Sequence, residues 1–180
     1  PICFANESLL RQALTHRSYI NEHGATDTGD NERLEFLGDA ILGSVICEAL
    51  FHRFPESPEG ELTRIKSVVV SRESCALVFQ QQGLEPYLVL GKGITVNRKI
   101  PQSVLATVFE ALVGGLALDG GYSAATNFVI AAMNGVVTAA AESTTGVNFK
   151  SLLQQRAQKL FGETPTYRVE EERGPDHSKC

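Results

Sequence analysis

Residues 32–40 read Glu-Arg-Leu-Glu-Phe-Leu-Gly-Asp-Ala, a short run that holds three carboxylates at spacings of three and four. On an α-helix, with about 100° per residue, Glu32, Glu35 and Asp39 fall within a sector of roughly 60°. Like charges stacked in this way destabilise an isolated helix by roughly 0.2–0.5 kcal/mol per pair. A ridge that repels itself indicates a site for a divalent cation, whereas the plainer alternative is a solvated acidic helix face.

The apolar residues of the same stretch predict how this helix packs. Leu34, Leu37 and Ile41 point to the side opposite the acids and form the expected core stripe. Phe36 lies beside the acids, away from that stripe, so this large aromatic side chain has no obvious place in its own core. We therefore expect Phe36 to contact a partner.

Hydrophobic periodicity and turn signals predict a chain that is mostly helical. Pro55 and Pro58 end the acidic helix, and Asp119-Gly-Gly121 separates two apolar helices farther along. The amphipathic segment 61–82 is interpreted as one helix or two. Helices are expected at residues 7–19, 31–54, 61–82, 101–118 and 123–141.

Composition bounds the class of protein. The chain has 180 residues, of which 43% are hydrophobic and none is Trp, and this fits an ordinary globular core and disfavours disorder. No run approaches the roughly 18–20 apolar residues that span a bilayer. Polar residues and glycines interrupt the most apolar stretch, 104–118, which is therefore expected to be a buried helix, and no membrane partner is predicted.

Cysteine spacing and charge bear on compartment and partners. The 4 cysteines are scattered without C-x-x-C spacing, which disfavours a zinc site or a disulfide framework and favours a reducing, cytoplasmic setting. The formal net charge is −5, and the excess of acidic residues lies before residue 148. Charge alone therefore neither supports nor excludes RNA as a partner.

The character of the chain changes after residue 141. Residues 142–147 read Glu-Ser-Thr-Thr-Gly-Val, a composition typical of a linker. A helix is expected over 149–161 and a first β-strand over 166–172. Roughly thirty residues that end after one strand are too few to bury a core. Residues 148–180 are therefore expected to be part of a truncated second domain.

Three motifs follow one another along the chain: Leu14-Thr-His-Arg-Ser-Tyr19, Asn31-Glu-Arg-Leu-Glu-Phe-Leu-Gly-Asp-Ala40, and Phe109-Glu-Ala-Leu-Val-Gly-Gly115 with Leu118-Asp-Gly-Gly121. On these motifs, residues 1–141 resemble the bacterial-type ribonuclease III family. Beyond the linker, residues 149–158, 165–169 and 174–177 resemble the opening helix, strand and loop of a double-stranded-RNA-binding domain. The resemblance implies an all-α endonuclease domain followed by part of an α+β RNA-binding domain.

The resemblance also implies roles for the acidic residues and for the stranded aromatic. Glu35 and Glu110 match metal-binding carboxylates, Asp39 matches the catalytic aspartate and shares the catalytic role with Glu110, and Glu32 matches a supporting acidic position. Phe36 matches an aromatic that packs into the partner subunit of a homodimer. The implied activity is hydrolysis of double-stranded RNA with Mg²⁺, for which Mn²⁺ is expected to substitute, to 5′-phosphate and 3′-hydroxyl ends.

One position departs from the family pattern. The family places an aspartate three residues before the glutamate matched by Glu110, and this chain has Thr107 there. Positions 107 and 110 share a helix face, so the geometry is kept while a negative metal ligand is lost. A neutral hydroxyl is a weak Mg²⁺ ligand, although it can hydrogen-bond a metal-bound water. The alternative function is therefore a catalytically impaired, dimeric binder of double-stranded RNA.

Two further sets of polar residues have open interpretations. By the resemblance, Gln154, Gln158 and His177 lie against the RNA minor groove, where side chains read 2′-hydroxyls and shape. The plainer alternative is an ordinary polar helix surface. His16 and Arg17 are interpreted either as catalytic or phosphate-contacting residues, or as hydrogen-bonding groups that pack the first helix against the acidic one.

Overall fold

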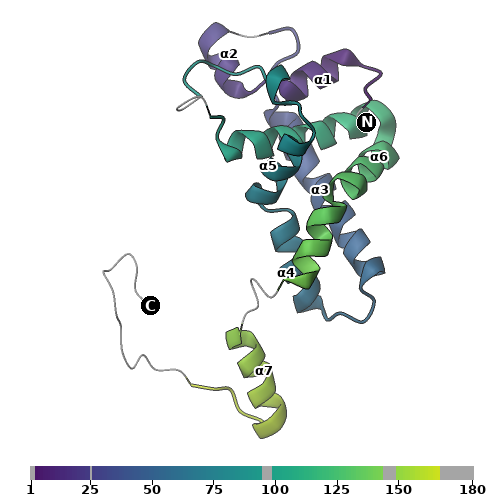
Figure 1. Cartoon of the computed structure of the whole chain (residues 1–180), viewed down its shortest axis with the longest axis vertical. Coiled ribbons are helices and arrows are strands. Elements are labelled where there is room, and N and C mark those ends of the chain that lie inside the picture. The colour runs from purple at the N-terminus through teal and green to yellow at the C-terminus, as the bar shows by residue number, and fades with distance from the viewer. Residues whose placement is uncertain (1–2, 25, 95–98, 144–148, 167–180) are drawn as a thin grey trace, which may run out of the picture. The chain divides into compact units, whose positions relative to one another are not determined.

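Helices α3 (Glu32–Arg53) and α6 (Gln102–Glu142) pack against each other through the centre of the first part of the chain (Figure 1). The computed structural model describes residues 3–24, 26–94, 99–143 and 149–166. The chain divides into two compact units, Pro1–Thr145 and Gly146–Cys180, and each is described by itself. The prediction of a mostly helical chain is confirmed.

Shorter helices surround the central pair in the first unit. Helices α1, α4 and α5 all pack on α6, and α4 also contacts α3. The shorter elements are α1 (Glu7–Leu14), α2 (Arg17–His23), α4 (Glu59–Val69), α5 (Arg72–Gln81) and the 3₁₀ turn η1 (Glu85–Tyr87). The segment expected as one helix or two is therefore two, and the Ser71 side chain caps the second by accepting from the Ser74 backbone N–H.

Two glycines allow α3 and α6 to meet backbone to backbone. A Cβ at Gly38 would lie 1.8 Å from the backbone oxygen of Glu110, and a Cβ at Gly114 would lie 2.3 Å from that of Leu34. Real Cβ atoms do not approach other atoms so closely, so each position requires glycine. The crossing fixes α3 against α6 at the level of the acidic residues.

The prediction of one helix over 7–19 is wrong, because the chain breaks between α1 and α2. Thr15 forms an isolated parallel bridge with Val89, in which the Val89 N–H donates to the Leu14 carbonyl and the His16 N–H donates to the Val89 carbonyl. His16 then begins α2 as its N-cap, accepting from the Ser18 backbone N–H. A partner 74 residues away in the chain overrides the local helical pattern.

Helix α6 contains both apolar helices that were expected separately. Gly121, with φ 80° and ψ 172°, kinks it where the sequence predicted a break. Helix α6 is long and apolar enough to span a membrane, yet 61% of its most apolar window is buried inside the fold. The predicted buried helix is confirmed from Val104 to Leu116, whereas Leu118 is exposed. Helix α6 thus supplies the centre of a globular core.

The second unit contains α7 (Phe149–Phe161), which confirms the helix expected there. Residues 167–180 lie outside the described part of the chain, and with them nearly all of the strand expected at 166–172. The prediction of an α+β RNA-binding domain in this unit stays a prediction.

Candidate active site

Four of the predicted site residues lie at the crossing of α3 and α6. Glu35 and Asp39 are one turn apart on α3, and Thr107 and Glu110 are one turn apart on α6. The Thr107 hydroxyl donates to Glu35 Oε1 at 3.0 Å, across the helix interface. Glu35, Thr107 and Glu110 are half-buried, and Asp39 is exposed. The cross-helix hydrogen bond therefore lies at the half-buried end of a group that is open to solvent at Asp39.

The carboxylates of this group repel one another. The pKa of Glu110 is raised to about 7, chiefly by burial and then by the charges of Asp39 and Glu35, against the opposing charge of Arg72. The pKa of the Cys75 thiol rises to about 12, chiefly through burial and then through Glu110 and Asp39. Clustered carboxyl groups that disfavour each other's charge are typical of sites that bind a cation or transfer protons.

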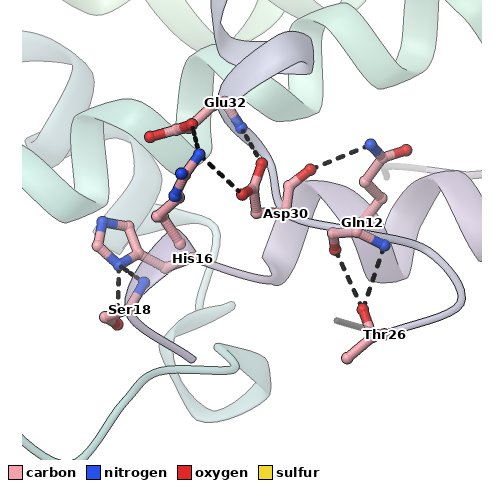
Figure 2. A network of polar contacts seen from close by, with 8 residues as sticks. Gln12, His16, Ser18, Thr26, Asp30 and Glu32 are labelled. Atoms are coloured by element: carbon pink, nitrogen blue, oxygen red, sulfur yellow. Dashed lines mark hydrogen bonds and ion pairs between the residues drawn. The ribbon is translucent and has the colours of Figure 1, made fainter. Parts of the chain in front are cut away.

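Glu32 belongs to a different group, although it shares the same helix face. Its carboxylate forms an ion pair with the Arg17 guanidinium, which also lies 3.5 Å from Asp30. The Glu32 backbone N–H donates to Asp30 Oδ1 at 3.2 Å, and Gln12 Nε2 donates to the Asp30 carbonyl (Figure 2). The helical wheel predicted a single acidic ridge. The structure divides it into two groups, because the Arg17 guanidinium from α2 pairs with Glu32.

Carboxylates of both groups act on the charge of His16. Burial lowers its pKa, and Glu35, Glu32 and Asp30 oppose that shift. Its Nδ1 caps α2 at Ser18, as Figure 2 shows. The contacts of His16 with α2 and of Arg17 with Glu32 agree with the interpretation that these two residues pack the first helices against the acidic one.

Phe36 is the most exposed large hydrophobic residue of α3, with 82% of its surface accessible. Leu34 and Ile41 are buried and Leu37 is half-buried, so the core stripe on the opposite side is confirmed. Phe51 repeats the exposed position near the other end of the helix, at 67%. The role of Phe36 at a subunit interface stays a prediction.

In the second unit, the predicted RNA-contacting residues are only partly within the described chain. Gln154, Gln158, Lys159 and Thr164 line an open hollow of about 480 Å³. The Gln158 amide closes the end of α7, donating to the Gly162 carbonyl at 3.3 Å and accepting from the Thr164 hydroxyl at 3.2 Å. His177 lies outside the described residues.

The donor chemistry at the crossing fits a hard divalent cation. Glu35, Asp39, Glu110 and Thr107 offer only oxygen atoms, which Mg²⁺ and Mn²⁺ prefer. Among the described residues, no three His, Cys, Asp or Glu side chains converge as a complete ligand set. Mg²⁺ commonly binds through one or two carboxylates and keeps several waters, so a complete protein cage is not required.

Sequence reasoning missed the cation that faces the acidic group. Arg72 opens α5 and lowers the pKa of Glu110, against the effect of burial. No local signal marks it, because its relation to Glu110 depends on how α5 packs on α6. The sequence allowed two helices over 61–82, but it gave no sign that Arg72 would act on Glu110.

The first unit is a helical domain with a carboxylate group at the crossing of its two central helices, and comparisons with known proteins identify its family. The family model described as Ribonuclease-III-like matches residues 6–135. The chain belongs to the ribonuclease III family. This confirms the predicted family and its ribonuclease III-type domain.

The relatives give the extent of the similarity. The chain is 44% identical to Ribonuclease 3 of Rhodopirellula baltica over 98% of its own length and 65% of that protein. It is 44% identical to Ribonuclease 3 of Oleidesulfovibrio alaskensis over 98% of its length and 77% of that protein. The chain therefore spans about two thirds to three quarters of these relatives.

A solved structure supports the fold of the first unit. The nuclease domain of ribonuclease III from Campylobacter jejuni matches with a TM-score of 0.65 and 31% identity, covering 74% of this chain and 90% of that one. That study concerns flexibility in a region of the Campylobacter jejuni protein involved in dimer formation.

Proposed function

We propose that the chain is a divalent-metal-dependent endoribonuclease that hydrolyses phosphodiester bonds in double-stranded RNA. The observation that carries the proposal is the group of Glu35, Asp39 and Glu110, in which burial and then the charges of Asp39 and Glu35 disfavour ionisation of Glu110. A bound cation relieves that repulsion, and family membership supports RNA cleavage as the reaction that uses it.

Each residue of the group has a chemical task in this proposal. Glu35 and Glu110 would hold Mg²⁺, or Mn²⁺ in its place, with Glu32 as a more distant acidic support. The ion, when bound, supplies a polarised water and neutralises charge that develops on the phosphate. Asp39, which is exposed, would orient the attacking water and accept its proton.

The product ends follow from which bond breaks. The water oxygen forms a new bond to phosphorus, and the bond between phosphorus and the 3′-oxygen breaks. The departing 3′-oxygen takes a proton from solvent and becomes a 3′-hydroxyl. The phosphate stays on the 5′ side of the next nucleotide, so the products carry 5′-phosphate and 3′-hydroxyl ends.

A homodimer would present one such site to each strand of a duplex. Phe36 supports this arrangement, because an 82% exposed aromatic next to the acidic group has no packing role within its own subunit. Phe36→Ala should shift the sedimentation coefficient toward the monomer with the thermal transition unchanged. Tyr87→Ala, at another exposed aromatic, is the control and should leave the dimer intact.

The second unit would add contacts to the duplex. Gln154, Gln158 and His177 are proposed to face the minor groove, and the open hollow beside Gln154 and Gln158 gives room for a sugar edge. We also propose a reducing, cytoplasmic setting, because the 4 cysteines are scattered along the chain.

The direct test is cleavage of a long RNA duplex at low salt by the 180-residue chain, with Mg²⁺, with Mn²⁺ and with a chelator. We expect cleavage with either metal, none with the chelator, and 5′-phosphate ends on the products. Asp39→Asn should bind the duplex and fail to cut it. Cleavage that persists with excess chelator would remove the metal from the proposal.

Thr107 favours a second candidate, a catalytically silent protein that binds duplex RNA as a dimer. The Thr107–Glu35 hydrogen bond occupies one oxygen of a proposed metal ligand. Tight duplex binding without cutting in either metal, together with cutting by Thr107→Asp, would favour this candidate.

A further inference from the structure

We infer that Thr107 is a positioning residue: its hydroxyl holds Glu35 in place across the α3–α6 interface, and it does so without adding a negative charge. The inference deepens the proposed function and rests on it, since Glu35 matters as a ligand only if the group binds a cation. It assigns Thr107 an active role, where the family comparison alone marks only a missing aspartate.

The direction of the hydrogen bond is fixed by chemistry. An ionised carboxylate only accepts, so the Thr107 hydroxyl is the donor in the 3.0 Å contact with Glu35 Oε1. A hydroxyl has one proton to donate, and threonine in a helix commonly gives it to the carbonyl one turn back. Here the proton goes to a residue 72 positions away instead.

The backbone around this contact leaves little freedom for Glu35 to be held in another way. The close approach of Gly38 to the Glu110 carbonyl, and of Gly114 to the Leu34 carbonyl, fixes the two helices against each other near it. Glu35 is half-buried and forms no ion pair within the described part of the chain, since the Arg17 guanidinium pairs with Glu32 and Asp30. The Thr107 hydroxyl is its donor at this interface.

An aspartate at position 107 would act differently before any metal arrives. It would place a further carboxylate beside Glu35 and one turn from Glu110, which already repels Glu35 and Asp39. The metal-free site would then depend on a cation to hold it together. With Thr107 the carboxylate is oriented in the metal-free protein, and the hydrogen bond engages Glu35 Oε1 and not Oε2.

The test measures Mn²⁺ binding by electron paramagnetic resonance, with the 180-residue chain and no RNA. Thr107→Val keeps the shape and removes the hydroxyl, and we expect it to weaken Mn²⁺ binding roughly tenfold, as is common for groups that orient metal ligands. Thr107→Ser keeps the hydroxyl and should bind within about threefold of wild type, well short of that loss.

The matched control is Thr126→Val on the same helix. The Thr126 hydroxyl is buried and has no hydrogen-bond partner within the described part of the chain. The same chemical change there should leave Mn²⁺ binding unchanged. A loss in both variants would mean that any Thr→Val change in α6 disturbs the site, and would overturn the inference.

Thr107→Asp tests the charge. In the presence of chelator it should unfold at a lower temperature than wild type, by about 2–4 °C, because it adds a like charge. With Mn²⁺ it should bind more tightly than wild type. A chelated Thr107→Asp protein at least as heat-stable as wild type would contradict the inference.

The outcomes separate the inference from the proposed function. If wild type binds Mn²⁺ and cuts duplex RNA while Thr107→Val binds Mn²⁺ equally well, the inference alone fails. It also fails if Thr107→Ser is as weak as Thr107→Val. If wild type neither binds Mn²⁺ nor cuts, the proposed function fails and takes the inference with it.

Discussion

The carboxylates at the start of α3 form two groups that this fold treats differently. Asp30 and Glu32 share the Arg17 guanidinium near the surface, so a cation offsets part of their charge. Glu35 lies one turn farther on, half-buried, and faces a neutral hydroxyl and the carboxyl of Glu110. The acids that pair with Arg17 are called the compensated group, and Glu35, Asp39 and Glu110, which form no ion pair within the described residues, are called the uncompensated group.

The contrast between the two acidic groups indicates which of them is expected to take part in catalysis. An exposed, balanced pair contributes about 0–1 kcal/mol and is common on protein surfaces. A half-buried carboxyl whose pKa is raised to about 7, by burial and then by neighbouring carboxylates, is a cost to the fold. Such a cost is typical of residues that function requires, and four predictions follow from the contrast.

The largest expected effect separates the two groups by activity. Glu110→Gln removes one charge with little change of shape, and we expect it to reduce the rate of duplex cleavage roughly 10³-fold, the scale of several kcal/mol of metal-assisted stabilisation. Glu32→Gln should reduce it by less than roughly fivefold, because Glu32 acts through a surface pair. Single-turnover cleavage with Mg²⁺ measures both.

Equal losses of cleavage rate in the two variants would mean that Glu32 contributes to catalysis as much as Glu110 does, despite its ion pair with Arg17. Circular dichroism of each variant is the control for folding.

The crossing that creates the uncompensated group can be tested through its glycines. Gly38→Ala forces a Cβ against the Glu110 backbone oxygen, at 1.8 Å if nothing moves. We expect a loss of about 3 kcal/mol in the free energy of unfolding, since an overpacked backbone contact has no flexible side chain to yield. Urea denaturation measures this loss.

Gly135→Ala on α6 is the matched control, because a Cβ there meets nothing within 4 Å. It should stabilise the chain by about 0.5–1 kcal/mol, through the better helix propensity of alanine. A Gly38→Ala protein as stable as wild type would show that the helices need not meet so closely.

Local patterns predicted much of this site. Helical periodicity gave Glu35 and Asp39 a common face, put Leu34 and Ile41 in the core, and left Phe36 exposed. These statements depend on neighbours three to seven residues apart. The pairing of this face with residue 110 came from the family resemblance, because no periodicity links α3 to α6.

What the sequence did not reveal depends on contacts between distant segments. Arg17 takes Glu32 out of the ridge from 15 residues upstream, and Val89 interrupts the first helix at Thr15. The donor role of Thr107 toward Glu35 spans 72 residues. Each requires the packed fold, in which one long-range contact outweighs a local preference.

The electrostatic cost of the uncompensated group should appear as a pH dependence of stability. The pKa of Glu110 is raised from 4.5 to about 7 in the folded chain. Between these values the folded state keeps a proton that the unfolded state has lost, so stability falls as pH rises and levels off above about 7. With allowance for partial exposure, the loss is about 1–3 kcal/mol.

Denaturation in chelator at pH 5 and at pH 7.5, for wild type and for Glu110→Gln, isolates this contribution. The wild-type protein should lose more stability than the variant across the interval. Parallel behaviour of the two proteins would mean that Glu110 titrates as an ordinary surface acid and that its group is not strained.

The smallest expected effect concerns the compensated group. Arg17→Met keeps the aliphatic part of the side chain and removes the guanidinium that Glu32 and Asp30 share. Because the pair is exposed, we expect a loss of no more than about 1 kcal/mol in the free energy of unfolding, and less of it at high salt. Cleavage at saturating RNA should stay near the wild-type rate, because the change leaves the Thr107–Glu35 contact untouched. A large fall in that rate would mean that Glu32 belongs to the catalytic group after all. Without Arg17, its carboxylate would then compete with Glu35 and Glu110 for the metal ion.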